Sequence, residues 1–371
     1  MRRNPDLLVI GGGVIGCAIA HAVAGSGRSV LLVDRGDLGG EASSAAAGVL
    51  AVASGGEADG PGLALRRASL ERFAPLVEAL QTETGIEVEY EPTGVLELCL
   101  TEDDEAEAAA RIVRRRAQGF RVERLDARAL RGEAPGANPT AGAAVLFADD
   151  ARVSPARLVA ALAAAAGARG AELVAGAAVL GAERAGDRIA RVRVGAQWVI
   201  PETVVLAAGA WAAHVPGIAP GLRVQPARGQ MLALRPSAPL CCRVLSYEDG
   251  YLVPCRGGEV LLGATVEHVG FKKAVTPGGL GALTAKLGAL APAALDAPVV
   301  RQWAGLRPFA PDGGPILGRP PGTTNLILTC GHHRNGILLA PITAEVVTSL
   351  LEGRPPGVDI GPFLPASQAA A

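Results

Sequence analysis

Three glycines near the start of the chain have the spacing of a phosphate-binding turn. Gly11, Gly13 and Gly16 form a Gly-x-Gly-x-x-Gly pattern, and Asp34 follows 18 residues after the last of them. In such a turn the first glycine permits a tight bend, the second lets the backbone approach a pyrophosphate, and the third lets a helix pack closely on a strand. The helix N-terminus then faces the phosphates, and the acidic residue accepts a hydrogen bond from a ribose hydroxyl. The pattern favours dinucleotide binding over a glycine-rich turn in an ordinary α/β sheet.

The residues around this turn have the pattern of a βαβ unit. Residues 6–10 and 29–33 are short apolar runs that suit buried parallel strands. Between them, residues 14–24 have a helical pattern that ends at Gly25 and Gly27. The unit has the length of about 30 residues that this motif requires.

The stretch that follows favours FAD over a nicotinamide cofactor. A nicotinamide enzyme would continue with further βα units, whereas this chain enters a loop of small residues at 39–48. Such a loop can lie along an extended cofactor, with the hydroxyls of Ser43 and Ser44 as donors and residues 45–48 allowing close approach. The alternative is a flexible linker, which the lack of proline and the apolar continuation at Val49 and Leu50 disfavour.

The rest of the chain predicts an α/β fold with an α+β insert. We expect helices over 62–84, 102–118, 155–168, 278–290 and 337–351, antiparallel strands over 86–100, strands over 172–180, 189–199, 203–208 and 326–329, and a strand-rich stretch over 222–266. We interpret residues 1–85, 141–215 and 296–371 as a discontinuous, Rossmann-like FAD-binding domain. Residues 86–140 and 216–295 then form an interleaved, mainly antiparallel substrate-binding domain.

Composition disfavours several classes of protein. The 35 Lys and Arg nearly balance 36 Asp and Glu, for a net charge of −1, so a nucleic-acid or membrane-surface partner is not expected. The six cysteines form no Cys-x-x-Cys pair and no Cys/His cluster, which indicates reduced thiols and no metal site. The longest apolar run, between Arg157 and Arg169, is too short to span a bilayer. We therefore expect a cytoplasmic protein without a membrane span.

Eight motifs in order along the chain carry a resemblance to a known family. They are GGGVIG (11–16), GGEASSAAAG (39–48), VVLAAGAW (204–211), YLVP (251–254), LGAT (262–265), WAGLRP (303–308), PDG (311–313) and GHHRNGILLAP (331–341). The chain closely resembles the glycine oxidase family of thiamine biosynthesis, which are flavoenzymes of the D-amino-acid oxidase superfamily. The resemblance covers nearly the whole chain. Its most specific parts are the WAGLRP motif with the PDG that follows it, and GHHRNGILLAP, because FAD binding alone requires neither.

The resemblance implies noncovalent FAD and the oxidation of glycine or other small amines, such as sarcosine or D-amino acids, to imines. Hydride passes to flavin N5 from the neutral amine, and molecular oxygen is reduced to hydrogen peroxide. The reaction would supply the precursor of the thiamine thiazole. Sarcosine oxidases tether FAD through a cysteine just before the Pro-Asp pair, whereas residues 305–310 contain none. The resemblance also implies a homo-oligomer.

Site residues follow from the matching positions. Arg307 would bind the substrate carboxylate, Tyr251 would add a hydroxyl contact, and Arg334 would lie near carboxylate and flavin. The implied cofactor-contacting residues are Gly11, Gly13, Val14, Ile15, Gly16, Asp34, Arg35, Ala42, Ser43, Ala47, Gly48, Val49, Val179, Gly209, His332, His333, Arg334, Asn335, Gly336, Ile337 and Leu338. An arginine fits this role because it is always charged and can bind a carboxylate through two parallel hydrogen bonds. The alternatives are a surface ion pair for Arg307 and a core hydroxyl for Tyr251.

The sequence departs from the family pattern at four positions. His333 replaces the usual Phe or Tyr, Val49 and Val266 replace methionines of some members, and Asp249 replaces a histidine. An inward-pointing Asp249 would weaken the affinity for an amino acid. Two other functions stay open at this point: a D-amino-acid or secondary-amine dehydrogenase that passes electrons to a quinone or carrier, and a noncatalytic flavin-binding subunit of a complex.

Overall fold

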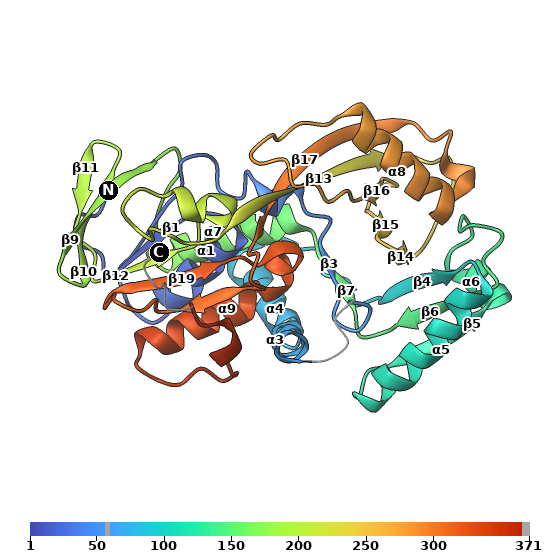
Figure 1. Cartoon of the computed structure of the whole chain (residues 1–371), viewed down its shortest axis with the longest axis horizontal. Helices are drawn as coiled ribbons and strands as arrows, with labels where there is room; N and C mark the ends of the chain where they lie inside the picture. Colours follow the sequence, from blue (N-terminus) through green and yellow to red (C-terminus); the bar gives the residue numbers. More distant parts are fainter. Residues whose placement is uncertain (56–59, 366–371) are drawn as a thin grey trace.

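Short apolar runs form a six-stranded sheet in one half of the molecule (Figure 1). In the computed structural model, which describes residues 1–55 and 60–365, its strand order is β18 (Ile316–Gly318), β19 (Leu326–Cys330), β12 (Thr203–Leu206), β1 (Leu7–Ile10), β2 (Val30–Val33) and β8 (Glu172–Val174). Every neighbouring pair is parallel except β18 with β19. Every residue of β1 and β2 is buried, as expected for a parallel sheet that is covered on both faces.

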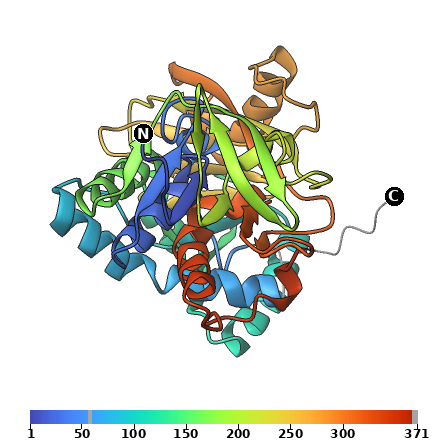
Figure 2. The ribbon, with the colours of Figure 1, turned by 90° about the vertical axis from the view of Figure 1, so that its left-hand side faces the viewer.

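Helices cover one face of this sheet and a small sheet covers the other. Leu7 and Val9 face α1 (Val14–Ala24), α7 (Pro155–Ala168) and α9 (Gly336–Leu351). Leu8 and Ile10 face the antiparallel sheet of β9 (Val179–Ala185), β10 (Arg188–Val194) and β11 (Gln197–Val199). Figure 2 shows this green sheet in front of the blue strands. The alternation of side chains along each strand therefore divides them between two cores.

An eight-stranded sheet forms the other half. Its order is β17 (Val299–Phe309), β13 (Gln225–Leu234), β16 (Val260–Gly263), β15 (Gly250–Pro254), β14 (Val244–Tyr247), β4 (Val95–Cys99), β6 (Ala143–Phe147) and β5 (Val122–Asp126). All neighbours are antiparallel except β14 with β4. Leucines of one face pack against α8 (Pro277–Leu290), and the opposite face carries Met231, Val253 and Tyr251.

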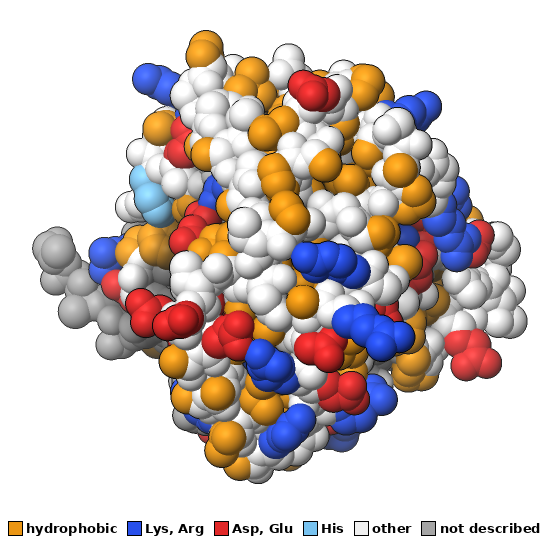
Figure 3. Space-filling model, turned by 90° about the vertical axis from the view of Figure 1, so that its right-hand side faces the viewer, with side chains coloured by type: hydrophobic (Ala, Val, Ile, Leu, Met, Phe, Trp, Pro, Cys, Tyr) orange, Lys and Arg blue, Asp and Glu red, His pale blue; other side chains and the backbone are white. Residues whose placement is uncertain are grey.

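Helix α5 (Glu102–Ala117) lies at the outer end of this half. A capping box between Thr101 and Asp104 starts the helix, its first turn is acidic and its last turn carries three arginines. Both charge placements stabilise the helix dipole. On the face shown in Figure 3, Lys and Arg side chains are interspersed with Asp and Glu side chains.

Long strands and short helices connect the two halves. Strands β13 and β17 pair along ten residues and extend from one half into the other (Figure 1). A two-stranded ribbon of β3 (Val49–Leu50) and β7 (Ala151–Arg152) also lies between them. The remaining helices are α2 (Ala42–Ala45), α3 (Pro61–Leu70), α4 (Phe73–Thr84), α6 (Ala127–Glu133), η1 (Gly209–His214), η2 (Pro292–Ala294), η3 (His333–Asn335) and η4 (Gly361–Phe363).

The predicted α/β class with an antiparallel insert is confirmed, but several predicted elements were wrong. The helix over 62–84 is two helices, because Pro75 has no N–H and its ring would collide with the Glu71 carbonyl in a continuous helix. Only β4 forms within 86–100; Glu89 has a φ of 56° and Pro92 cannot donate to a ladder. The strands over 172–180 and 189–199 are each interrupted at glycines with positive φ, Gly176 and Gly195.

The sheets also bear on the predicted domain boundaries. Residues 143–147 (β6) and 299–309 (β17) pair within the eight-stranded sheet, whereas the ranges predicted from the sequence place them with the FAD-binding part. We propose that β6 and β17 belong to the substrate-binding part. The length of β17, the longest strand described in residues 1–55 and 60–365, was not predicted.

No helix within residues 1–55 and 60–365 has the length and apolar character that a membrane-spanning helix needs. Within the same residues, no group of three or more His, Cys, Asp or Glu side chains is placed to hold a metal ion.

Candidate active site

A cavity of about 810 Å³ lies between the two halves of the molecule, and a second cavity of about 370 Å³ adjoins it. Gly13, Ala42, Ser43, Ala207 and Gly209 line both. The second cavity follows the carboxyl ends of β1, β2 and β12, where open α/β sheets bind their ligands. Together the cavities form an elongated space, with one end in each half.

Two glycines of the turn are required by backbone packing. Gly11 has a φ of 112°, and a Cβ there would collide with the Ala207 carbonyl. A Cβ at Gly16 would collide with the carbonyl oxygen of Gly11. These contacts match the tight turn and the close helix packing that the motif predicts.

The N-terminus of α1 opens onto both cavities. Gly13 lines both, and Val14 and Ile15 line the larger one. The Val14 N–H donates to the Ser43 Oγ at 3.0 Å, so the loop predicted to follow the cofactor is held against this helix end. The first turn of α1, residues 14–17, carries no acidic side chain, and its dipole therefore favours an anionic group.

Asp34 lies at the end of β2 and lines the second cavity. Its carboxylate accepts hydrogen bonds from the Gly12 N–H at 2.7 Å and the Gly36 N–H at 2.8 Å. Both oxygens are therefore oriented by backbone and keep lone pairs for a ligand hydroxyl. The guanidinium of the adjacent Arg35 lies 4.0 Å above the ring of Trp211, which lines the same cavity.

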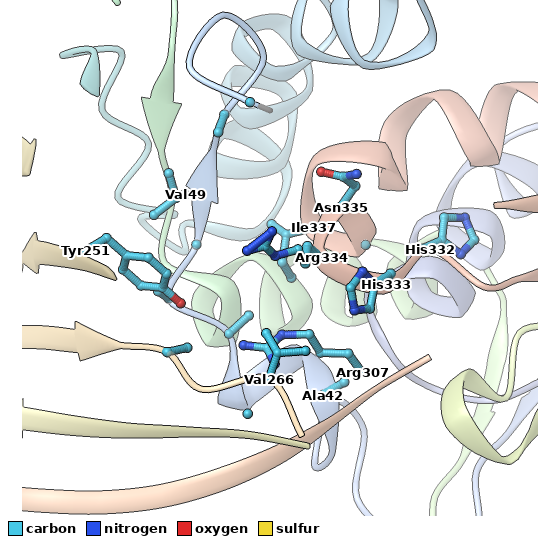
Figure 4. Close-up of a pocket in the computed structure, with 18 of the residues that line it drawn as sticks. Ala42, Val49, Tyr251, Val266, Arg307, His332, His333, Arg334, Asn335 and Ile337 are labelled. Atoms are coloured by element: carbon cyan, nitrogen blue, oxygen red, sulfur yellow. The ribbon is translucent and has the colours of Figure 1, made fainter. Parts of the chain in front are cut away.

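Arg307 comes from β17 and points into the larger cavity (Figure 4). Its Nη1 donates to the Thr265 carbonyl at 3.0 Å. The guanidinium lies over Gly229, where any Cβ would collide with it. Burial lowers the pKa of Arg307 from its ordinary value, but that value is so high that the side chain keeps its charge.

Tyr251 comes from β15 and lines the larger cavity beside Arg307, with its hydroxyl toward the cavity (Figure 4). Its ring lies over Gly263, where a Cβ would be 2.6 Å from the ring atoms. Burial raises the pKa of Tyr251, against the effect of the charges of Arg307 and Arg334, so its hydroxyl is protonated at neutral pH. The hydroxyl is thus available as an uncharged hydrogen-bonding group next to the guanidinium.

The turn from β19 through η3 into α9 forms a further wall of the cavity. Arg334 extends from it into the cavity (Figure 4). His332 is buried and its Nε2 lies 3.1 Å from the Thr343 Oγ1. Burial lowers the pKa of His332 to about 3, so its imidazole is neutral near pH 7.

His333 has a positive φ of 47°, and its ring contacts the edge of Phe309. Burial and the charges of Arg307 and Arg334 lower the pKa of His333 to about 4, so it too is neutral. Among the described residues its Nε2 has no hydrogen-bond partner. At neutral pH the positive charge in this part of the cavity therefore comes from the arginines.

The structure brings nearly all the predicted site residues to the two cavities. Those lining the larger cavity are Gly13, Val14, Ile15, Ala42, Ser43, Ala47, Gly48, Val49, Gly209, Tyr251, Arg307, His332, His333, Arg334, Asn335, Gly336 and Ile337. Those lining the second cavity include Gly11, Asp34, Arg35 and Val179. Gly16 and Leu338 are not among the described residues that line either cavity: Gly16 serves packing, and Leu338 is buried in the core.

The residues that depart from the family pattern lie at different depths in the larger cavity. Val49 and Val266 line the larger cavity. Asp249 lies at its rim, is 59% exposed, and forms an ion pair with Lys286 of α8. The ammonium group offsets the negative charge that would otherwise oppose a substrate carboxylate.

The sequence predicted no role for Glu97, which lines the larger cavity, or for Trp303, which bonds a residue that lines it. Trp303 donates through Nε1 to the Ala45 carbonyl at 3.0 Å and so joins β17 to α2, the short helix that precedes β3. Glu97 of β4 lines the far end of the larger cavity and pairs with Arg111. A charged residue within the apolar run of β4 is the signal that identifies Glu97, whereas Trp303 stood in a quoted motif without a role.

Comparison with known proteins identifies the family. The family model described as FAD dependent oxidoreductase matches residues 6–350. The chain belongs to this family. FAD as its cofactor, predicted from the sequence, is thereby confirmed.

The relatives of this FAD-dependent oxidoreductase confirm the resemblance to glycine oxidases. It is 34% identical to the glycine oxidase of Pseudomonas putida over 364 residues, which cover 98% of each chain. It is 36% identical over 359 residues to the bifunctional protein ThiO/ThiG of Synechocystis, covering 95% of this chain and 52% of that one. The crystal structure of glycine oxidase from Geobacillus kaustophilus superposes with a TM-score of 0.92 at 31% identity, covering 99% of this chain and 100% of that one.

The residues present fit FAD. Gly13 lines both cavities without a side chain, so a ligand can approach the backbone of the turn, and the unopposed α1 dipole suits a pyrophosphate. Asp34 and the Ala42–Ala47 segment follow the elongated space from one cavity into the other.

Proposed function

We propose that this FAD-dependent oxidoreductase is an amino-acid oxidase that converts glycine, or another small amino acid or amine such as sarcosine or a D-amino acid, to its imine. Molecular oxygen is the acceptor and is reduced to hydrogen peroxide. The observation that carries the proposal is the placement of the Arg307 guanidinium and the Tyr251 hydroxyl on the wall of one cavity (Figure 4). The glycine oxidases among the relatives support the same substrate class.

Arg307 is the carboxylate-binding residue of the proposal. Its guanidinium donates two parallel hydrogen bonds to the carboxylate, and the carbonyl of Thr265 fixes its position from the other side. Tyr251 adds a hydroxyl contact, and Arg334 supplies a second positive charge. Bound FAD supplies the oxidation by accepting a hydride from the substrate carbon.

The chain's own residues then act by positioning. A carboxylate held at two points has its α-carbon in one place, and a reacting pair held about 3–3.5 Å apart gains much of the rate from orientation alone. The amine reacts in its neutral form, so no side chain has to remove a proton from carbon. His332 and His333, whose pKa values are lowered to about 3 and about 4, are uncharged at neutral pH and add no competing charge.

The physiological reaction we propose is the supply of the precursor of the thiamine thiazole. The support is the similarity to ThiO/ThiG of Synechocystis, of which this chain spans about half. We also propose that FAD is held noncovalently, since residues 305–310, which precede the Pro-Asp pair, contain no cysteine.

The test begins with purified protein that carries its cofactor. Acid treatment should release all the flavin as FAD, and mixing with glycine, sarcosine, D-alanine or D-proline without oxygen should bleach the flavin absorbance. Ethylamine, which has no carboxylate, should bleach it far more slowly. Oxygen uptake with peroxide release supports an oxidase; reduction of a quinone-like dye in place of oxygen would contradict the proposed acceptor. Protein that none of the amines reduces would contradict the proposed substrate class.

A further inference from the structure

A short segment beyond β16, Thr265 to Glu267, pairs with β13 beside Arg307. The backbone N–H of Arg228 donates to the Glu267 carbonyl at 2.8 Å, and the Glu267 N–H donates back at 2.9 Å. The Thr265 carbonyl in this segment accepts the 3.0 Å hydrogen bond from Arg307 Nη1. The position of the segment therefore determines where one edge of the guanidinium lies.

A buried polar network holds this segment. The Glu267 carboxylate accepts hydrogen bonds from Arg228 Nη2 at 2.5 Å, from Gln230 Nε2 at 2.7 Å and from the Thr265 Oγ1 at 2.7 Å. The Thr265 Oγ1 also accepts from the Gln230 N–H at 2.9 Å. Arg228 is only 6% exposed and Gln230 is fully buried. Buried groups of this kind stay in place only while their partners do.

The network lies on the side of the sheet away from the cavity. Arg307 lies over Gly229 of β13. Side chains alternate along a strand, so those of Arg228 and Gln230, on either side of Gly229, project from the opposite face of the sheet. There Gln230 Oε1 accepts from the Thr276 N–H at 2.8 Å, at the start of α8. The network thus links α8 and the segment that bears the Thr265 carbonyl.

We propose that Thr265 and Glu267 are positioning residues for Arg307. Thr265 places its carbonyl against Nη1, and Glu267 holds Thr265 through its hydroxyl. The guanidinium is then held with its remaining N–H groups toward the cavity, ready to meet a carboxylate. This inference rests on the proposed role of Arg307 and adds the residues on which that role depends.

The substitution Thr265→Val tests the inference, and Thr265→Ser is its matched control. Valine keeps the shape of threonine but cannot bond Gln230 or Glu267, whereas serine keeps the hydroxyl. The measured quantity is the Kd of acetate, an unreactive carboxylate, followed by the change in flavin absorbance of the FAD-bound protein. We expect Thr265→Val to raise this Kd by about tenfold and Thr265→Ser to leave it within about twofold, with FAD affinity unchanged in both.

A double-mutant cycle separates positioning from a merely structural role. The slope of the anaerobic flavin-reduction rate against glycine concentration is measured in wild type, Thr265→Val, Arg307→Ala and the double variant. Because Thr265 acts through Arg307, the valine should lower the slope by about tenfold in the wild type and by less than about twofold once Arg307 is absent. Equal effects in both backgrounds would overturn the inference.

Two further outcomes distinguish a failure of this inference from a failure of the proposed function. If Arg307→Ala weakens acetate binding and Thr265→Val does not, this inference is overturned and the proposed function stands. If Arg307→Ala itself has no effect, the proposed function and the inference fail together. Should Thr265→Val not fold, Glu267→Gln replaces it: it removes the charge that holds Arg228, is expected to raise the acetate Kd, and an unchanged Kd overturns the inference.

Discussion

The cofactor-facing and substrate-facing walls of the cavities are built in different ways. On the cofactor side the wall consists mainly of backbone. Gly11 and Gly16 let the turn, β12 and α1 pack closely together, and the N-terminus of α1 presents its N–H groups. On the substrate side, side chains from separate strands converge, with Arg307 from β17 and Tyr251 from β15.

This difference separates two kinds of dependence on sequence. The backbone wall is encoded within a few consecutive residues and tolerates many side chains, provided that glycines stay where a Cβ would collide. The side-chain wall depends on pairing between distant strands and on the groups behind them. We therefore expect substitutions on the first wall to abolish cofactor binding and those on the second to change substrate use while FAD stays bound.

The largest expected effect is on the backbone wall. Gly16→Ala places a methyl group against the Gly11 carbonyl, where only a backbone shift can relieve the collision. We expect FAD affinity to fall by about a hundredfold or more, measured by titrating apoprotein with FAD and following flavin fluorescence. Gly288→Ala in α8 is the control: no atom lies near its Cβ, so affinity should not change. Equal FAD affinity in both variants would contradict the account.

The buried histidine of the cofactor-side turn predicts a pH dependence of stability. His332 has a pKa of about 3 in the folded protein, below the ordinary value of 6.5. Below pH 6.5 the imidazole of His332 therefore takes up a proton in the unfolded chain, whereas in the folded protein it stays neutral until the pH approaches 3. The contribution of His332 to the free energy of unfolding is fully present above pH 6.5 and decreases as the pH drops toward 3. This contribution falls by about 2 kcal/mol between pH 7 and 5.

The substitution His332→Gln checks this by urea unfolding at pH 7 and pH 5. The variant should lose less stability than wild type over this interval, because glutamine does not titrate. His333, whose pKa is lowered to about 4, adds a dependence of the same sign, so part of the slope should remain. The same loss in variant and wild type would refute the assignment to His332.

A smaller effect is expected on the side-chain wall. Tyr251→Phe removes the hydroxyl on the cavity wall beside Arg307 but keeps the ring over Gly263. We expect kcat/KM for glycine to fall by about tenfold, with FAD content equal to that of wild type. Loss of FAD together with activity would show that the two walls are not separable at this position.

The smallest effect is expected at the rim. Asp249 is mostly exposed and its charge is paired with Lys286, so Asp249→Asn should change kcat/KM for glycine by less than about twofold. A rise of about tenfold in kcat/KM would show instead that the carboxylate acts on the substrate, as a free acid pointing inward would.

What the sequence predicts follows the same division. The βαβ unit and the turn at 331–338 were predictable because each is a contiguous motif with one backbone geometry. The resemblance also named Arg307 and Tyr251. The hydrogen bond from Arg307 to the Thr265 carbonyl was not predictable, because it joins residues 42 positions apart that meet only through the pairing of both segments with β13.

Other errors have local physical causes. Pro75 divides a helix whose apolar pattern runs on without a break, and positive-φ glycines end strands that looked continuous. The long strand β17 was missed because its exposed first half carries no apolar alternation.

One measurement tests the central claim most directly: the rate of anaerobic flavin reduction by glycine in wild type and in Arg307→Ala, at equal FAD content. If Arg307 holds the carboxylate, the variant should remain yellow, and glycine should reduce its flavin at least about a hundredfold more slowly than in wild type. Its rate with ethylamine should match that of wild type. Equal rates with glycine in the two proteins would contradict the account.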